Sequence, residues 1–182
     1  MKSLEKLERG KMRGYIQVYT GDGKGKTTAA LGLALRAAGA NLKVYIAQFA
    51  KSGEYSEIKA LKKLEEHVTV RQYGRGVFIN GRPDEDDIRM SRQGLEEAKG
   101  VMCSGEYDLV ILDEANIATR YGLLTVAELM EVIEAKPEQV ELVITGRDAD
   151  PSVIERADLV TRMEAVKHYF EKGVQARQGI EK

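Results

Sequence analysis

The sequence lacks several features that mark specialised classes of protein. It has one cysteine, Cys103, so no disulfide can form within the chain, and this fits a reducing compartment. No apolar run approaches the roughly 18 residues that a membrane helix needs. The first residues, MKSLEKLERGKMR, are too charged to contain the apolar core of a secretory signal. We therefore expect a soluble cytoplasmic protein without a membrane partner.

The chain also lacks an excess of charge of either sign. Lysine and arginine total 28 and aspartate and glutamate 29, which gives a formal net charge of −1. Because surfaces that bind nucleic acid are usually basic, this balance argues against nucleic acid as a general partner. With 182 residues, 43% hydrophobic and 31% charged, the composition is that of an ordinary globular protein with a sizeable core.

Segments typical of strands alternate with segments typical of helices from Gly14 onward. This alternation predicts one α/β domain over residues 14–182, built around a mainly parallel sheet. Residues 1–13 form a charged N-terminal arm, either a short helix or a loose segment. The predicted strands are 14–19, 43–50, 68–72, 107–116, 140–147 and 157–164, and the predicted helices are 27–38, 55–66, 84–102, 125–135 and one starting at 150.

Three local signals predict where helices begin and end. Gly39 is a plausible C-terminal cap for the first helix. Thr125 and Glu128 have the spacing of a capping box. Asp150 followed by Pro151 has the cap-plus-proline pattern of a helix start.

The stretch YTGDGKGKTTAALG, residues 19–32, predicts a phosphate-binding loop. Its end, Gly25-Lys26-Thr27, matches the P-loop template G-x-x-x-x-G-K-[ST], whereas the first template glycine is replaced by Thr20. A predicted strand enters the loop and a helix leaves it, as in P-loop proteins. Glycines let backbone amides approach phosphate oxygens, and the helix start adds positive potential. We expect a P-loop NTPase-like (RecA-like) fold with helices on both faces of the sheet.

The residues of this loop have distinct predicted roles. Lys26 would neutralise the terminal phosphates, and the hydroxyl of Thr27 would bind Mg²⁺. Lys24 is a further loop cation, equally consistent with a phosphate contact and with a solvated side chain. The predicted ATP-binding residues are Gly21, Asp22, Gly23, Lys24, Gly25, Lys26, Thr27, Thr28 and Arg147.

The strand that ends in LVILDE predicts the second half of the site. It carries Asp113 and Glu114 to the carboxyl edge of the sheet, where open α/β sheets bind ligands. Asp113 suits Mg²⁺ coordination, directly or through another ligand, and Glu114 suits a metal, a water or a substrate hydroxyl. Arg147 ends another buried strand at the same edge and is a candidate for a phosphate or ribose contact, or for a surface salt bridge.

These motifs indicate a protein that binds Mg²⁺ and nucleotide, without choosing its reaction. A small-molecule kinase would release ADP and a phosphorylated product. An ATP-switched module would use Glu114 to orient a hydrolytic water. Alkyl transfer from ATP is the third possibility, because all three classes hold a triphosphate.

Four segments together resemble the P-loop class of ATP:corrinoid adenosyltransferases, also called cob(I)yrinic acid a,c-diamide or cob(I)alamin adenosyltransferases. They are GDGKGKTTAA (residues 21–30), ILDE (111–114), VITGR (143–147) and VKHYFEKGVQARQGI (166–180). The similarity covers nearly the whole chain from Gly14, in order, and the last segment is the most specific. Where some members have a GFTW-type sequence, this chain has GRGVFI (74–79) and no tryptophan.

The resemblance implies an enzyme that transfers an alkyl group. A Co(I) corrinoid, cobalamin or a precursor, attacks the 5′ carbon of ATP and releases tripolyphosphate. ATP and reduced corrinoid would be the substrates, with Mg²⁺ or Mn²⁺ bound by Thr27, Asp113 and Glu114. Lys26, Thr27 and Glu114 would be the catalytic residues. The loop would hold the leaving group, whose growing charge it would stabilise in the transition state.

The resemblance also implies an apolar surface beneath the corrin ring, which favours cobalt without a lower axial ligand. Phe78, Ile79 and Tyr121 are the candidates for this surface, chosen by their position in loops, and Arg75 and Arg82 are candidates for contacts with corrinoid carboxylates or amides. Further expectations by analogy are a flavoprotein reductant and a homodimer.

Overall fold

The computed structural model describes residues 13–50, 52–75 and 83–181, in which strands and helices alternate. Apart from its last residue, the predicted N-terminal arm lies outside the described residues. The strands are β1 (Ile16–Thr20), β2 (Val44–Phe49), β3 (Val68–Tyr73), β4 (Leu109–Asp113), β5 (Glu141–Thr145) and β6 (Leu159–Arg162). The helices are α2 (Lys26–Gly39), α3 (Ser56–Leu61), α4 (Glu85–Cys103), α5 (Ala115–Arg120), α6 (Val126–Glu134) and α7 (Pro151–Arg156), with 3₁₀ turns η1 (Lys62–Leu64) and η2 (Tyr169–Lys172).

The six strands form one sheet in the order β3-β2-β4-β5-β1-β6. All five neighbouring pairs are parallel, so the sheet is entirely parallel rather than mainly so. Parallel neighbours require crossover connections, and here helices supply most of them. All strands therefore end at the same edge of the sheet, where the connecting loops can assemble a site.

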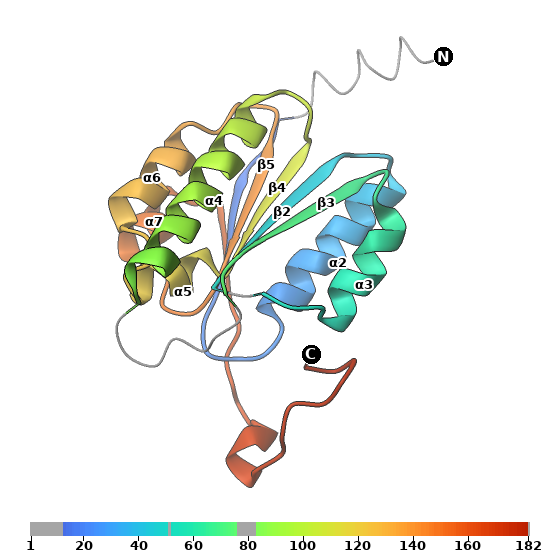
Figure 1. Cartoon of the computed structure of the whole chain (residues 1–182), viewed down its shortest axis with the longest axis vertical. Coiled ribbons are helices and arrows are strands. Elements are labelled where there is room, and N and C mark those ends of the chain that lie inside the picture. Colours follow the sequence, from blue (N-terminus) through green and yellow to red (C-terminus); the bar gives the residue numbers. More distant parts are fainter. Residues whose placement is uncertain (1–12, 51, 76–82, 182) are drawn as a thin grey trace.

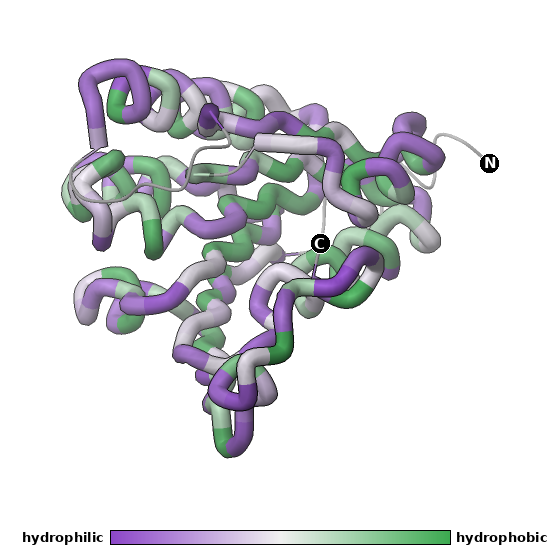
Figure 2. Tube along the Cα trace, turned by 60° about the horizontal axis from the view of Figure 1, so that its bottom comes forward, coloured by the Kyte–Doolittle hydropathy of each residue, from purple (hydrophilic) through white to green (hydrophobic). Residues whose placement is uncertain are grey.

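Helices cover both faces of the sheet, as predicted (Figure 1). On one face α2 and α3 enclose a core that includes Ala34, Ile46 and Ile111. On the other, α4, α5, α6 and α7 enclose a larger core around Leu112 and Leu129. Figure 2 shows the hydrophobic residues concentrated in the central strands and the hydrophilic ones on the outer helices. Burial on both faces explains why the strands have nearly continuous apolar sequences.

The predicted helix starts are confirmed at two positions. Thr125 and Glu128 form the capping box: the Thr125 hydroxyl accepts from the Glu128 amide at 3.1 Å, and the Glu128 carboxylate accepts from the Thr125 amide at 2.7 Å. Asp150 accepts a hydrogen bond from the Ser152 amide, with Pro151 as the first helical residue. Among the residues described, no helix combines the length and apolarity needed to cross a membrane.

Two helix ends differ from the prediction. Gly39 is the last residue of α2 rather than its cap, and the left-handed residue that turns the chain is Asn41, with φ 59°. Asparagine tolerates this conformation better than most residues. The predicted helix 55–66 ends at Leu61 and tightens into η1, whose spacing of three residues keeps Leu61 and Leu64 on the same core.

Two short helical segments were not predicted from the sequence. The predicted strand 107–116 ends at Asp113, and α5 begins two residues later. Glu114 makes this turn with φ 62°. Glycine is the usual residue in this conformation, so a glutamate at this position gave no sign of the turn. The segment after β6, expected to be merely polar, contains the 3₁₀ turn η2.

Candidate functional site

The glycine loop between β1 and α2 has backbone conformations that side chains disfavour. Gly21 has φ 93° and Gly25 φ 124°. Behind the loop lies the chain just after β6: the Gly23 amide donates to the Met163 carbonyl at 2.7 Å, and the Met163 amide donates to the Thr20 carbonyl at 2.8 Å. A Cβ added at Gly21 would lie 2.4 Å from the Met163 carbonyl oxygen. The glycines therefore allow the loop to pack closely against this segment.

Lys26, the first residue of α2, is held within the curve of the loop. Its side chain is largely buried, and its Nζ donates to the carbonyl oxygens of Gly21 at 2.6 Å and Gly23 at 2.7 Å. The ammonium group therefore lies within the loop that leads into the N-terminus of α2. A cation and a helix N-terminus together make a strong site for a phosphate chain.

Alternation along the strands brings three polar side chains to the α2 face of the sheet. Ile46, Ile111 and Val143 belong to the core on that face, and the residues two positions later on the same strands are Gln48, Asp113 and Thr145. Side chains two apart share a face of a strand. Gln48 and Asp113 are also paired across the β2–β4 register. The sheet therefore aligns these three residues beneath the start of α2.

Asp113 is the centre of this polar cluster. It is fully buried, and its Oδ1 accepts from the hydroxyls of Thr27 at 2.8 Å and Thr145 at 2.7 Å. Its Oδ2 accepts from Nε2 of Gln48 at 3.1 Å. These donors compensate the cost of burying a carboxylate. They also tie the first turn of α2 to β2, β4 and β5, which fixes the position of the Thr27 hydroxyl.

Glu114 begins the turn from β4 into α5 at the same edge. Its left-handed backbone is stabilised by its amide, which donates to the Thr145 hydroxyl at 2.9 Å. Its side chain is partly exposed, in contrast to that of Asp113. A strained, non-glycine residue held in this way at a sheet edge is typical of functional sites.

The structure brings most of the predicted nucleotide-binding residues together. The glycines of the loop, Lys26, Thr27, Asp113 and Glu114 all lie at the carboxyl edge of β1 and β4. Asp22, Lys24 and Thr28 are exposed on the loop and the first turn of α2. Arg147 is exposed just after β5, next to Gly146, whose carbonyl accepts from Nδ2 of Asn116 at 3.3 Å.

Of the residues predicted to contact the corrinoid, only Tyr121 and Arg75 lie in the described part of the chain. Phe78, Ile79 and Arg82 lie outside the described residues. Tyr121 is half-exposed at the end of α5. Arg75 bonds to two aspartates at the start of α4, donating to Asp84 and, at 2.7 Å, to Asp87. These bonds raise the pKa of Arg75, first through Asp87 and then through Asp84.

Several residues of the site were not recognised from the sequence. Gln48 and Thr145 were missed, although each is a polar residue inside an apolar strand and so carried a signal. Met163 was also missed, because the backbone contacts it makes with the loop leave no trace in its side-chain type. The contact of Lys24 with the far end of the chain was also not predicted from the sequence.

The oxygen atoms of Thr27, Asp113 and Glu114 fit the preferences of a hard divalent cation. Within the described part of the chain there is no cluster of three or more histidine, cysteine, aspartate or glutamate side chains that would cage a metal by itself. The arrangement fits instead the usual binding of Mg²⁺, which takes one or two protein oxygens and completes its shell with phosphates and water.

A solved structure supports the fold assignment. The crystal structure of the RadB recombinase matches with a TM-score of 0.55 over 92% of this chain and 82% of the other, at 17% sequence identity. At this identity the likeness concerns the fold alone. It confirms the predicted P-loop NTPase-like (RecA-like) α/β architecture.

The comparisons with known sequences are more specific. Relatives described as corrinoid adenosyltransferases align over 93% of this chain. The one from Pseudomonas aeruginosa is 35% identical over 84% of its own length, that from Sinorhizobium sp 37% over 80%, and that from Escherichia coli K12 36% over 86%. The family described as ATP:corrinoid adenosyltransferase BtuR/CobO/CobP matches residues 12–181, from the strand before the loop to the segment beyond β6. The chain therefore belongs to the ATP:corrinoid adenosyltransferase family.

Proposed function

We propose that this enzyme transfers the 5′-deoxyadenosyl group of ATP to a Co(I) corrinoid, cobalamin or one of its precursors, and releases tripolyphosphate. The observation that carries the proposal is the family match over residues 12–181, which includes both the glycine loop and the segment beyond β6. The loop alone would fit a kinase or an ATPase equally well. The resemblance of the whole chain favours adenosyl transfer over both.

The loop holds the triphosphate in this proposal. Gly21, Gly23 and Gly25 let backbone amides face the phosphate oxygens, and the buried ammonium of Lys26 lies within reach of the same space. Asp22, Lys24, Thr28 and Arg147 border it from exposed positions. Because the leaving triphosphate gains negative charge as its bond to carbon breaks, these groups bind it more strongly in the transition state.

Thr27, Asp113 and Glu114 are the residues that would hold Mg²⁺ or Mn²⁺. When bound, the cation would neutralise charge on the phosphate oxygens. Asp113 fixes the Thr27 hydroxyl through the 2.8 Å hydrogen bond, and Glu114 presents a partly exposed carboxylate at the same edge. In this proposal Lys26, Thr27 and Glu114 are the catalytic residues, and Asp113 positions Thr27.

The reaction balances without a protein nucleophile. Co(I) supplies both electrons of the new cobalt–carbon bond and becomes formally Co(III). The bond between the 5′ carbon and its oxygen breaks, and its electron pair leaves with tripolyphosphate. No proton has to be removed from carbon or cobalt, so the site needs no general base. Catalysis rests on alignment of cobalt, carbon and leaving oxygen and on charge stabilisation.

The corrinoid would bind beside the 5′ carbon, against apolar side chains that disfavour a lower axial ligand. Phe78, Ile79 and Tyr121 remain the candidates for this surface. Reduction to Co(I) requires an electron donor, which we propose is a flavoprotein. We further propose that the protein works in the cytoplasm and as a homodimer.

The test is an anaerobic incubation with MgATP and chemically reduced cobalamin, followed by phosphorus NMR and by the visible spectrum of the corrinoid in the same tube. We expect tripolyphosphate and a light-sensitive alkylated corrinoid in equal amounts. ADP with a phosphorylated small molecule would support a kinase instead. ADP and inorganic phosphate with an unchanged corrinoid would support an ATPase.

A further inference from the structure

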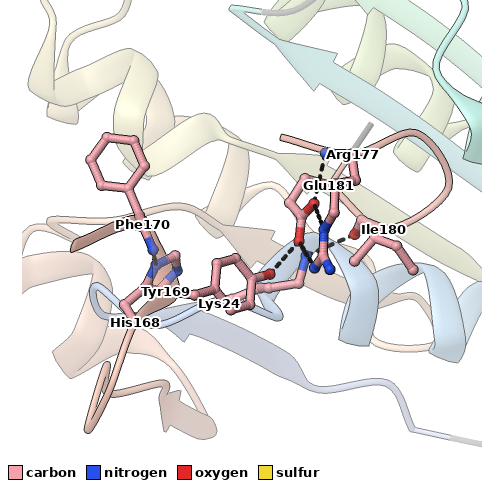
Figure 3. Close-up of polar contacts among 7 residues, drawn as sticks. All are labelled: Lys24, His168, Tyr169, Phe170, Arg177, Ile180 and Glu181. Carbon is pink, nitrogen blue, oxygen red and sulfur yellow. Dashed lines mark hydrogen bonds and ion pairs between the residues drawn. The ribbon is translucent and has the colours of Figure 1, made fainter. Parts of the chain in front are cut away.

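The segment that follows β6 folds back onto the glycine loop. We call residues 166–181 the C-terminal segment; Figure 1 shows it leaving the carboxyl edge of the sheet and curling beneath it. The contact joins residues 156 positions apart: Nζ of Lys24 donates to the carbonyl oxygen of Ile180 at 2.7 Å and lies 3.4 Å from Oε1 of Glu181 (Figure 3). The exposed lysine of the loop therefore has an intramolecular anion as its partner.

Glu181 is held mainly by its own segment. Its carboxylate accepts from the Tyr169 hydroxyl, from the Arg177 amide at 2.8 Å and from the Arg177 guanidinium at 3.1 and 3.2 Å. The guanidinium also lies over the Tyr169 ring, 5.1 Å from its centroid. Hydrogen bonds from Arg177 and then from Tyr169 hold the pKa of Glu181 far below its usual range. The charge of Glu181 is thus compensated even without Lys24.

Lys24 is the exchangeable member of this cluster. Its side chain is 41% exposed, against 17% for Glu181, and a lysine ammonium on its flexible stem is easily re-aimed. Exposed ion pairs of this kind are weak. A triphosphate in the loop would present several negative charges to the same ammonium, in a position where backbone amides and Lys26 already favour anions.

We propose that Glu181 competes with the triphosphate for Lys24, so that nucleotide binding draws Lys24 off Glu181 and releases the C-terminal segment from the loop. The proposal rests on the triphosphate site proposed above. When tripolyphosphate has formed, Glu181 recaptures Lys24 and thereby weakens the hold on this product. Glu181 is in this sense a positioning residue, which acts on the phosphate through Lys24.

The first test measures binding of magnesium tripolyphosphate to the full chain by calorimetry. Glu181→Gln keeps the shape of the side chain and removes its charge, so we expect binding about two- to fivefold tighter than in the wild type, the range that an exposed ion pair contributes. Glu171→Gln is the matched control, because it makes the same charge change on the same segment, but in the 3₁₀ turn η2 rather than at the end that meets Lys24. Equal or weaker binding by Glu181→Gln would overturn the proposal.

A double-mutant cycle with Lys24→Gln measures how far the effect of Glu181 on affinity depends on Lys24. In the Lys24→Gln background, Glu181→Gln should no longer change the affinity, because the two residues act through each other. An unchanged effect of Glu181→Gln in that background would mean that it acts by general electrostatics, and the proposal would fail.

Hydrogen exchange gives a readout that does not depend on turnover. Tripolyphosphate should speed amide exchange in peptides covering residues 174–181 and slow it in the loop, whereas Lys24→Gln should show fast exchange of the segment with and without the ligand. Slower exchange of the segment on binding would mean that it closes over the phosphate, contrary to our proposal. Failure of the wild type to bind tripolyphosphate at all would instead reject the phosphate site itself.

Discussion

At the scale of single residues, Lys26 and Asp113 make complementary contacts at the edge of the sheet. Lys26 bonds to the carbonyls of Gly21 and Gly23, and Asp113 joins Thr27 to Gln48 and Thr145. Substituting Lys26 would remove positive charge from the proposed phosphate site, together with the two hydrogen bonds to the loop carbonyls. Substituting Asp113 would remove the acceptor of two buried donors, on Gln48 and Thr145, and of the partly buried Thr27 hydroxyl, so it should destabilise the fold as well as the site.

We therefore expect Lys26→Ala to lower the rate of adenosyl transfer by about 100-fold or more, because it removes a cation that stabilises the leaving group. Thermal unfolding should change little, and release of tripolyphosphate is the measurement. Lys62→Ala, on the exposed 3₁₀ turn η1, is the matched control and should keep full activity. Near-normal activity of Lys26→Ala would contradict the role given to the loop.

Gly23 in the loop and Gly32 in helix α2 should respond in opposite ways to substitution by alanine. A Cβ at Gly23 would lie 2.8 Å from backbone atoms of Met163 and Glu164, so Gly23→Ala should push the loop away from the segment just after β6 and weaken binding of tripolyphosphate. A Cβ at Gly32, inside α2, meets nothing within 4 Å. Gly32→Ala should raise the free energy of unfolding by about 0.5–1 kcal/mol. Chemical denaturation and calorimetry of both variants check this, and equal behaviour of the two would refute it.

At the scale of elements, the capping box of α6 also anchors α4. The Glu128 carboxylate accepts from the amide and hydroxyl of Thr125 and pairs with Arg92 of α4 at 2.7 Å. Burial raises the pKa of Glu128, but the hydrogen bonds from Thr125 and the charge of Arg92 outweigh it and leave the pKa below its usual value of 4.5. One side chain thus serves both the helix start and the helix–helix contact.

Thr125→Ala should lower the free energy of unfolding by about 1 kcal/mol, as loss of a helix cap usually does.

The pKa of Glu128 is lower in the folded state than in the unfolded state. The contribution of Glu128 to stability is therefore fully present above about pH 4.5 and is lost as the pH falls through the folded pKa. Between pH 7 and pH 3, the free energy of unfolding measured with denaturant should fall less for Glu128→Gln than for the wild type. If the free energy of unfolding depended on pH in the same way in both proteins, this linkage would be ruled out.

At the scale of the whole molecule, β6 is an edge strand with exposed apolar side chains. Leu159 is 45% exposed and Val160 42%, and β6 pairs on its inner side with β1. Open, apolar strand edges are common places of association. This edge supports the proposed homodimer and offers a surface for it.

We expect the wild type to sediment as a dimer at micromolar concentration and Val160→Lys to shift it toward the monomer. Leu35→Lys is the control, because Leu35 is 60% exposed on helix α2, which covers a face of the sheet and is not part of the β6 edge. Equal dissociation by both substitutions would show that added charge rather than β6 is responsible. A wild type that stays monomeric would contradict the proposed homodimer.

The sequence by itself determined most of the helices and strands and the position of the glycine loop. Local patterns suffice for this, because a glycine loop between a strand and a helix, a capping box and apolar strands each depend on neighbouring residues. Thr27 and Asp113 could be assigned to one site because the carboxyl ends of parallel strands meet at one edge. The family resemblance then selected the reaction, which the motifs alone left open.

Only the tertiary structure decided which distant residues meet. The strand order β3-β2-β4-β5-β1-β6 places Gln48 and Thr145 on Asp113, and no local pattern encodes that order. The left-handed turn at Glu114 and the return of Glu181 to Lys24 likewise depend on packing and charge between segments far apart in the chain. Such contacts arise from the fold as a whole, because each side chain selects its partner only after the sheet has brought the two together.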